Sequence, residues 1–184
     1  MKTRNLGVLS AAVVVLLTLP TVNALAQPAS PARPVTFVER NLGGPRLGIT
    51  FSLGSSDYTE KLKEFGLGNT LSQFGWHFEY QVIPEGGGPQ FVIQFTPLLG
   101  GVEYGKIIPS ATLAMGVRFP GGFEFGMGPN LVATPDGIAS ALVIGIGKSF
   151  DYGGVSIPIN LALTHSTVGD RISIIFGYAI EKAR

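Results

Sequence analysis

The sequence predicts an all-β protein: an eight-stranded antiparallel up-and-down transmembrane β-barrel that follows an N-terminal signal peptide. Large apolar residues recur at every second position in segments of about ten residues, the length of a tilted membrane-spanning strand. The positions between them hold mostly Gly, Ala, Ser and Thr. Charged residues make up only 14% of the chain, whereas about a quarter of an average soluble domain is charged.

The N-terminus has the three parts of a secretory signal peptide, which we predict to span residues 1–26. Lys2 and Arg4 provide a positive start, residues 6–19 are mostly apolar, and residues 24–26 form a small-x-small cleavage pattern. A single membrane-anchor helix is the alternative, but the apolar run is shorter than the ~20 residues that span a bilayer. We therefore expect the protein to be exported.

Composition excludes several classes of function. Without Lys2 and Arg4, the chain carries 11 basic and 12 acidic residues, and this balance argues against a nucleic-acid-binding surface. The absence of Cys excludes disulfides, thiol catalysis, cysteine metal sites and a lipid-anchored lipoprotein. Because metal-ligand clusters and phosphate-binding glycine motifs are also missing, we expect no metal site and no cofactor.

The alternation runs through the predicted barrel, residues 46–184, after a Pro-rich linker predicted at residues 27–45. Residues 35–40 leave open whether a further strand or a plug precedes the barrel. Pro129 and Pro158 lie inside predicted strands, so we expect local bulges there. The strands are predicted at about residues 46–54, 73–82, 90–98, 109–119, 123–132, 140–150, 154–164 and 170–180.

Side-chain volume decides which face of the strands points inward. An eight-stranded barrel has an interior only just wide enough for its side chains, so roughly thirty large apolar residues would not fit inside. With the small residues inside, the barrel closes around a polar lumen and the large residues form a lipid-facing band. A two-sheet sandwich is the alternative fold, but it predicts Lys, Glu and Thr on its outer faces, where Lys and Glu are scarce.

The connections between strands are long at one end and short at the other. Residues 55–72 and 99–108 form long connections, whereas residues 120–122 and 151–154 form tight turns. In these features, residues 46–180 resemble the small outer-membrane β-barrels of Gram-negative bacteria. The resemblance implies that the linker and the short turns are periplasmic. It also implies location in the cell outer membrane, with outer-membrane lipid and the assembly machinery as partners.

The resemblance departs from the family pattern at the C-terminus. Such barrels often end on an aromatic residue that the assembly machinery recognises. Here Phe176 and Tyr178 are followed by residues 181–184, three of which are charged. Other aromatic residues gather toward the predicted strand ends, as in the girdles at the two membrane interfaces. The predicted lipid-interface aromatics are Phe74, Trp76, Tyr80, Phe119, Phe123 and Tyr178.

The polar residues that share the inward face are the candidates for chemistry. Arg118 and Glu124 flank the tight turn between two strands, so we expect them to form a cross-strand ion pair in the lumen. A network that satisfies buried polar groups is one interpretation, and a charge gate in a narrow pore is the other. The predicted lumen network comprises His77, Glu79, Gln94, Arg118, Glu124, Asn130 and Asn160, with Gln81 beside it.

Two connections carry further features. His165 and Ser166 are weak catalytic candidates, because a His beside a hydroxyl can act in acyl transfer. Some outer-membrane lipid A deacylases place a His and a Ser on such a barrel, but their His-x-Ser spacing is not matched and no acidic residue is evident to orient the His. Residues 58–66 predict a short helix with Tyr58, Leu62 and Phe65 on one face.

The leading functional interpretation is a barrel with a structural or surface-interaction role and a lumen filled by polar side chains. The first alternative is a narrow channel for small solutes. The second alternative is an outer-membrane lipid-modifying enzyme, an acyl hydrolase. The protein is more plausibly not an enzyme, because no complete catalytic constellation is evident, and the sequence does not identify a surface ligand.

Overall fold

The computed structural model describes residues 35–53, 57–134, 137–167 and 169–181, which belong to one compact unit. The predicted signal peptide and residues 27–34 of the predicted linker lie outside the described residues. Within the described part of the chain, no helix is both long enough and apolar enough to cross a membrane.

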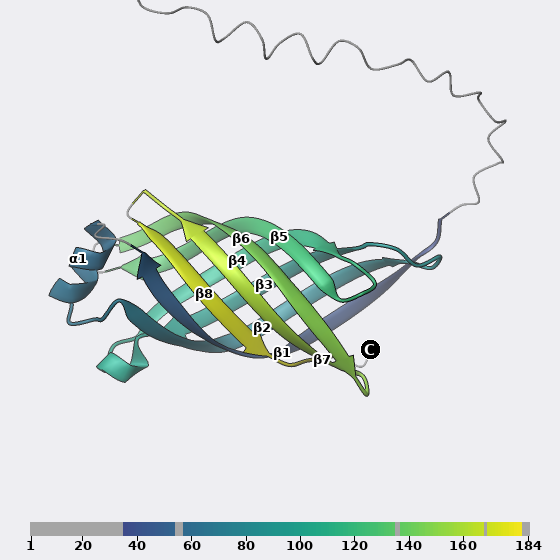
Figure 1. The fold of residues 1–184 in the computed structure, drawn as a ribbon, viewed down its shortest axis with the longest axis horizontal. Coiled ribbons are helices and arrows are strands. Elements are labelled where there is room, and N and C mark those ends of the chain that lie inside the picture. Colours follow the sequence, from purple (N-terminus) through teal and green to yellow (C-terminus); the bar gives the residue numbers. More distant parts are fainter. Residues whose placement is uncertain (1–34, 54–56, 135–136, 168, 182–184) are drawn as a thin grey trace, which may run out of the picture. The chain divides into compact units, whose positions relative to one another are not determined.

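The described residues form a closed antiparallel β-barrel, which confirms the predicted fold and excludes the sandwich (Figure 1). From β1 to β8 each strand pairs with the next in sequence, and β1 closes the barrel by also pairing with β8. The short β9 continues the line of β8 and pairs with β1 and β7, so the wall has eight strands. The strands are β1 (Phe37–Leu53), β2 (Thr70–Pro84), β3 (Gln90–Gly100), β4 (Ile108–Arg118), β5 (Phe123–Thr134), β6 (Gly137–Tyr152), β7 (Val155–His165), β8 (Asp170–Gly177) and β9 (Ala179–Glu181).

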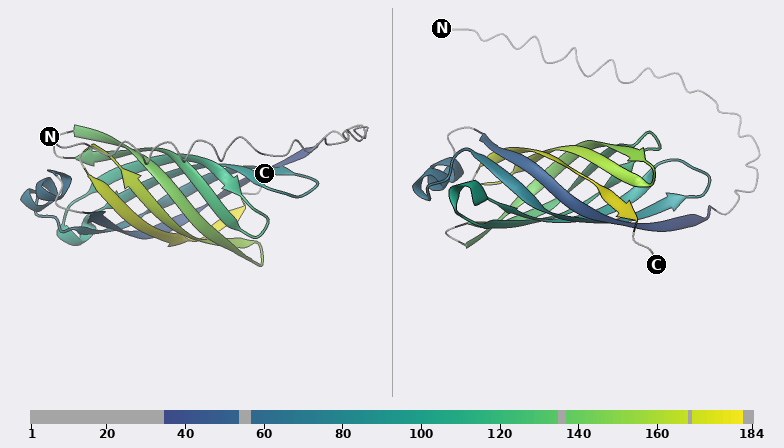
Figure 2. Two further views of the ribbon diagram at one scale, coloured as in Figure 1. Left: turned by 45° about the horizontal axis from the view of Figure 1, so that its top comes forward. Right: turned by 90° about the horizontal axis from the view of Figure 1, so that it is seen from below.

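Strand β1 begins at Phe37, so the predicted linker at residues 27–45 is wrong for residues 37–45. This part of the chain pairs with β2 as far as Pro84 (Figure 2). Gly43 and Gly44 suggested a turn, but they are strand residues that permit close approach across the barrel seam. A Cβ atom on Gly44 would lie 2.0 Å from the carbonyl oxygen of Tyr178.

The last predicted strand, residues 170–180, is interrupted at Tyr178, between β8 and β9. The register of β1 places Pro45 opposite Tyr178, and the register of β7 places Pro158 opposite Gly177. Proline has no N–H to donate to a neighbouring strand. Both neighbours of the break therefore carry a residue that cannot complete the hydrogen-bond ladder.

The predicted bulges at Pro129 and Pro158 are wrong. Pro129 pairs with Leu142 and Pro158 pairs with Ser149, and the register is unchanged on either side of each proline. Where the ladder between β4 and β5 is interrupted near Pro129, it resumes in the same register. The prolines cost ladder hydrogen bonds without inserting an extra residue.

The outer wall is apolar and the interior is largely polar, which is the arrangement of a transmembrane β-barrel. Large apolar side chains stand exposed on the outer face of every strand of the wall, among them Leu47, Phe78, Phe95, Met115, Phe125, Ile146, Leu161 and Ile174. Of the predicted interface aromatics, Tyr80 is half-buried. The other five, Phe74, Trp76, Phe119, Phe123 and Tyr178, are between 43% and 48% exposed.

The end of the barrel that carries the long connections is built up on one half only. Helix α1 (Asp57–Glu64) follows β1, and a 3-10 helix, η2 (Val102–Tyr104), follows β3. Figure 1 shows α1 at this end and the turn between β6 and β7 at the opposite end. At this end only residues 135–136 separate β5 from β6, and only residues 166–169 separate β7 from β8.

Helix α1 is held to the barrel by a small apolar cluster of Leu62, Leu67 and Leu71, with Ile108 packed against it. The prediction that Phe65 shares the packed face of the helix is wrong. Phe65 lies just beyond the helix and is exposed, and the ammonium group of Lys106 sits 4.7 Å from the centre of its ring.

Candidate functional site

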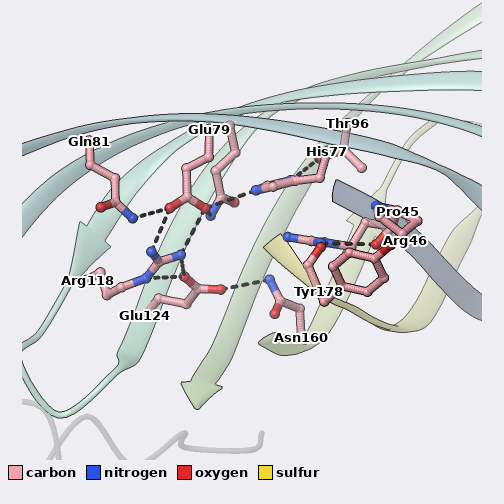
Figure 3. A network of polar contacts seen from close by, with 11 residues as sticks. Pro45, Arg46, His77, Glu79, Gln81, Thr96, Arg118, Glu124, Asn160 and Tyr178 are labelled. Atoms are coloured by element: carbon pink, nitrogen blue, oxygen red, sulfur yellow. Dashed lines mark hydrogen bonds and ion pairs between the residues drawn. The ribbon is translucent and has the colours of Figure 1, made fainter. Parts of the chain in front are cut away.

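The candidate site is a polar network inside the lumen, assembled from several strands (Figure 3). His77, Glu79 and Gln81 occupy every second position of β2, so they share one face of the strand and all three point inward. Arg118 and Glu124 come from β4 and β5, where they pair directly across the turn. Gly147 of β6 leaves room for this network, because a Cβ atom there would lie 2.8 Å from the Asn160 side-chain oxygen.

Arg118 joins the two buried glutamates of the lumen. Its Nη1 and Nη2 donate to the carboxylate of Glu79 at 2.6 and 2.9 Å. Its Nε donates to Glu124 at 2.9 Å, and Nη2 donates to the same oxygen at 2.5 Å. The predicted ion pair between Arg118 and Glu124 is therefore present, and it extends to Glu79 on the neighbouring part of the wall.

Glu79 is 4% exposed, and its carboxylate accepts hydrogen bonds from several side chains besides Arg118. His77 Nε2 lies 2.9 Å away, Gln94 donates at 3.2 Å, and Gln81 donates to the other oxygen. Because an ionised carboxylate only accepts, Nε2 of His77 carries a proton. A buried charge with this many donors is compensated and fixed in position.

The structure brings together most of the predicted lumen residues but not all of them. His77, Glu79, Gln94, Arg118, Glu124 and Asn160 form one continuous network, which Asn160 joins by donating to Glu124 at 2.9 Å. Asn130 lies apart from it. Its amide donates to Thr112 at 2.9 Å, and Arg171 donates to its carbonyl oxygen at 3.3 Å.

Sequence reasoning missed two buried arginines, Arg46 and Arg171. Arg46 was only the first residue of one predicted strand, and Arg171 lay at the start of another, beside a connection. Arg46 Nη1 donates to the carbonyl oxygens of Tyr178 at 2.8 Å and Pro45 at 3.1 Å. The sequence did hold a signal for Arg46. Every second residue of a strand lies on the same face, so Arg46 shares a face with the inward-facing Gly48 and Thr50.

Inward-facing side chains form contacts between neighbouring strands where prolines interrupt the backbone hydrogen-bond ladder. Between β2 and β3 the pairing is interrupted beside Pro97, and there His77 Nδ1 lies 2.9 Å from the Thr96 hydroxyl. At the seam, Arg46 donates to the carbonyl of Tyr178 opposite Pro45. These side chains supply contacts between strands that the prolines cannot make through the backbone.

A cavity of about 120 Å³ lies beside the network. The residues around it include Glu124 and Asn160 of the network and both newly found arginines. Hydroxyl and amide side chains supply much of the remaining polar lining: Thr50, Gln73, Thr96, Ser110, Thr112, Asn130, Thr164 and Ser173.

The weak catalytic candidates lie in the turn between β7 and β8. His165 Nδ1 is 2.7 Å from a carboxylate oxygen of Asp170, so the expectation that no acidic residue orients this His is wrong. Ser166, however, donates its hydroxyl proton to the carbonyl oxygen of Gly169 at 2.7 Å. Across the described ranges, no cluster of His, Cys, Asp and Glu is placed to hold a metal ion.

An apolar outer wall around an ion-paired lumen defines the class: a small membrane-spanning β-barrel with a polar interior. Among solved structures, the chain is similar to Ail, the attachment invasion locus protein of Yersinia pestis, with a TM-score of 0.47 and 11% identity. The match covers 77% of this chain and 97% of that chain.

A second structure of Ail, in complex with the heparin analogue sucrose octasulfate, matches with a TM-score of 0.42 and 14% identity. This match covers 77% of this chain and 99% of that chain. No protein-family model and no curated protein matches the sequence.

Proposed function

We propose that the protein is a plugged β-barrel of the bacterial outer membrane with a structural or surface-interaction role. The observation that carries this proposal is the buried network of Glu79, Arg118 and Glu124, which links β2 to β4 and β5 across the lumen. A lumen crossed by compensated ion pairs suits a barrel that displays its loops better than one that conducts solutes.

The membrane part of the proposal is supported by the outer wall. Its exposed apolar residues form a band that is poorly suited to water, whereas barrel closure satisfies the backbone polar groups that a bilayer would leave unpaired. We propose outer-membrane lipid as the partner of this band. The expected signal peptide at residues 1–26 agrees with export, and the short turns would then face the periplasm.

The assembly machinery of the outer membrane is the second proposed partner. Phe176 and Tyr178 are exposed on the outer face near the end of the last wall strand, although Glu181 and further residues follow them. We propose that this aromatic pair is read as an internal assembly signal. Phe176→Ala with Tyr178→Ala is expected to reduce the amount of assembled protein in the membrane, whereas unchanged assembly would contradict the proposal.

Gel mobility with and without boiling tests the membrane assignment. Folded outer-membrane barrels resist detergent unfolding, so the unboiled sample is expected to migrate differently from the boiled one. Protein that is monomeric and soluble without detergent would overturn the assignment. Planar-bilayer recording tests the plug, because we expect no steady conductance from the native protein.

The two alternative functions have their own tests. Steady conductance that changes in Arg118→Ala or Glu124→Ala would favour the narrow channel over the plugged barrel. The contact between His165 and Asp170 is the observation that keeps an acyl hydrolase as a second candidate. A lipid-deacylating activity of the native protein that disappears in His165→Ala would support it, and the absence of such activity in the native protein would remove it.

A further inference from the structure

One buried arginine of the lumen, Arg46, makes no hydrogen bond to a carboxylate of the described residues. Among the described residues, the buried charged side chains are three arginines, Arg46, Arg118 and Arg171, and two glutamates, Glu79 and Glu124. Arg118 contacts both glutamates, so these carboxylates are already engaged. Buried charges in a medium of low dielectric are normally paired. Arg118 therefore engages both carboxylates, and Arg46 makes no hydrogen bond to either of them.

Arg46 makes no hydrogen bond or ion pair to a carboxylate among the described residues, although Glu79 and Glu124 are near enough to attract it electrostatically. It is 4% exposed, and its Nη1 donates to the carbonyl oxygens of Tyr178 and Pro45, which carry no net charge. Its Nε and Nη2 have no hydrogen-bond partner among the described residues. These two donors form one edge of the guanidinium fork, which matches the two oxygens of a carboxylate or a phosphate.

Arg46 borders a cavity that is lined in part by polar side chains. Figure 3 shows the guanidinium extending from β1 into the lumen. The cavity of about 120 Å³ is bordered by Arg46, and around it stand hydroxyl groups of Thr50 and Ser173, which lie 2.7 Å from each other. A single water needs at least about 10–15 Å³ of such space, so a small anion with a few waters can be accommodated.

Arg171 borders the same cavity nearer the end that carries α1. Gly177 pairs with Arg46, and Arg171 precedes Gly177 by six residues along β8. At about 3.3 Å per residue, the backbone positions of the two arginines are roughly 20 Å apart along the strand. The network of Arg118 lies toward the short turns. An anion that enters from the α1 end would therefore pass one cation and meet a second.

We propose that this lumen cavity binds a small oxyanion, a carboxylate or a phosphate, through Nε and Nη2 of Arg46. The cavity also borders Glu124 and Asn160 of the polar network, but Arg46 is not one of the residues that form the plug, and binding does not require conduction. A ligand of this class supplies the acceptors that the free edge of Arg46 lacks.

The first experiment measures phosphate binding by the refolded protein in a maltoside detergent, which contains no phosphorus. The 31P resonance of inorganic phosphate is expected to broaden on addition of the native protein, and the effect should saturate with phosphate concentration. Acetate, added as a competing carboxylate, is expected to reverse the broadening if both oxyanions use the same site. If acetate has no effect, the site is specific for phosphate.

Arg46→Met is expected to weaken phosphate binding by at least about tenfold, because the charge and both free donors are lost. Arg40→Met is the matched control, because Arg40 pairs with Glu181 and does not border the cavity, and it should bind as the native protein does. Equal binding by the native protein and Arg46→Met would overturn the proposal, as would the absence of saturable binding by the native protein.

A second measurement does not depend on the folding of any variant. Crystals of the native protein soaked in selenate, an anomalous scatterer of phosphate-like shape, should show a peak within hydrogen-bond distance of the Arg46 guanidinium. Selenate peaks confined to the outer surface would contradict the site. This result is independent of the conductance test, so the anion site and the plugged barrel can fail separately.

Discussion

Arg118 shows how a single residue determines the state of the lumen. It donates to two carboxylates on different strands, and each carboxylate is buried. A buried ion pair gives uncertain net stability, but removal of one partner leaves an uncompensated charge. The network is therefore most vulnerable at the residue that both glutamates share.

Arg118→Met is expected to reduce the free energy of unfolding by about 3–5 kcal/mol, because Glu79 and Glu124 would face each other without a cation. Urea unfolding in detergent, followed by tryptophan fluorescence, measures the change. The same substitution at Arg40, which pairs with Glu181 in a partly exposed position, should cost about 1 kcal/mol or less. Similar losses at the two arginines would contradict the role of burial.

Arg46 and Pro45 are expected to be energetically coupled. Arg46→Met removes the donor to the Tyr178 carbonyl and should cost about 1–3 kcal/mol. In a Pro45→Ala background the backbone N–H is restored opposite that carbonyl, so the same change should cost about 1 kcal/mol less. A double-mutant cycle from unfolding curves measures the coupling, and strict additivity would show that the two residues act independently.

Parity along a strand was enough to predict which polar residues face the lumen, because the side chains of a strand alternate in direction. It could not predict how they partner. Asn130 and Asn160 are both polar inward-facing residues, yet they join different clusters, because partnership depends on the stagger between strands. Arg46 was missed because the strand was predicted to begin with it, when β1 begins nine residues earlier.

At the scale of the strands, close packing across the wall depends on glycine at chosen positions. A Cβ atom on Gly128 of β5 would lie 1.9 Å from the carbonyl oxygen of Leu113 in β4, which no backbone tolerates without a shift. A Cβ atom on Gly145 of β6 would have no neighbour closer than 3.8 Å. Gly128 and Gly145 both lie inside strands, but only Gly128 is needed for close packing against the neighbouring strand.

Gly128→Ala is expected to lower the midpoint of urea unfolding or to reduce the yield of folded barrel on the gel. Gly145→Ala is the matched control, because it adds a Cβ atom without a clash. It should be neutral or stabilising by about 0.5–1 kcal/mol, since alanine loses less backbone entropy than glycine on folding. Equal destabilisation at both positions would show that the close contact at Gly128 is not what matters.

Glu103 fastens η2 to β2 in a pH-dependent manner. It accepts hydrogen bonds from the backbone amide and hydroxyl of Ser72, the former at 2.7 Å. Burial alone would raise the pKa of the Glu103 carboxyl, but the bonds from Ser72 outweigh it and hold this pKa below its ordinary value of 4.5. The ionised form is thus favoured in the folded loop.

Because the folded-state pKa is lowered, the contribution of Glu103 to loop stability is complete above its ordinary pKa. It is lost as the pH falls through the lower folded value. Backbone amides of residues 101–107 should therefore exchange faster relative to the barrel strands in this acidic range. Glu103→Gln should abolish the pH dependence, and a persistent dependence in that variant would assign it to another group.

The two largest departures from the predicted strands, the early start of β1 and the break after β8, involve glycine or proline. Gly43, Gly44 and Pro45 are turn formers by local propensity, and only the approach of Tyr178 across the seam explains why they are strand residues. The break at Tyr178 likewise arises from prolines on the two strands beside it. Local propensity carries no information about a neighbour that is distant in sequence.

At the scale of the whole molecule, two summed properties were sufficient to predict the barrel. Alternation of period two gave the strands, and the total volume of the large residues placed them outside. Both are sums over many residues, so local errors at Pro129 or Phe37 did not affect the outcome. The resulting outer wall can be tested with one natural probe.

Trp76 is the single tryptophan of the sequence and is 45% exposed on the outer wall. In vesicles whose lipids carry bromine on the acyl chains, its fluorescence should be strongly quenched, because the indole contacts the hydrocarbon or its boundary. Iodide in the aqueous phase should quench it weakly. The reverse order of quenching would show that this face of the barrel meets water.

The uneven rim at the α1 end has a consequence for engineering. Helix α1 and η2 stand over strands from the first half of the chain, whereas the connections after Thr134 and His165 are short. A foreign peptide inserted at residues 166–167 would extend from the less built-up half of the rim. If the proposed orientation holds, the barrel could then serve as a compact carrier for epitopes on a bacterial cell.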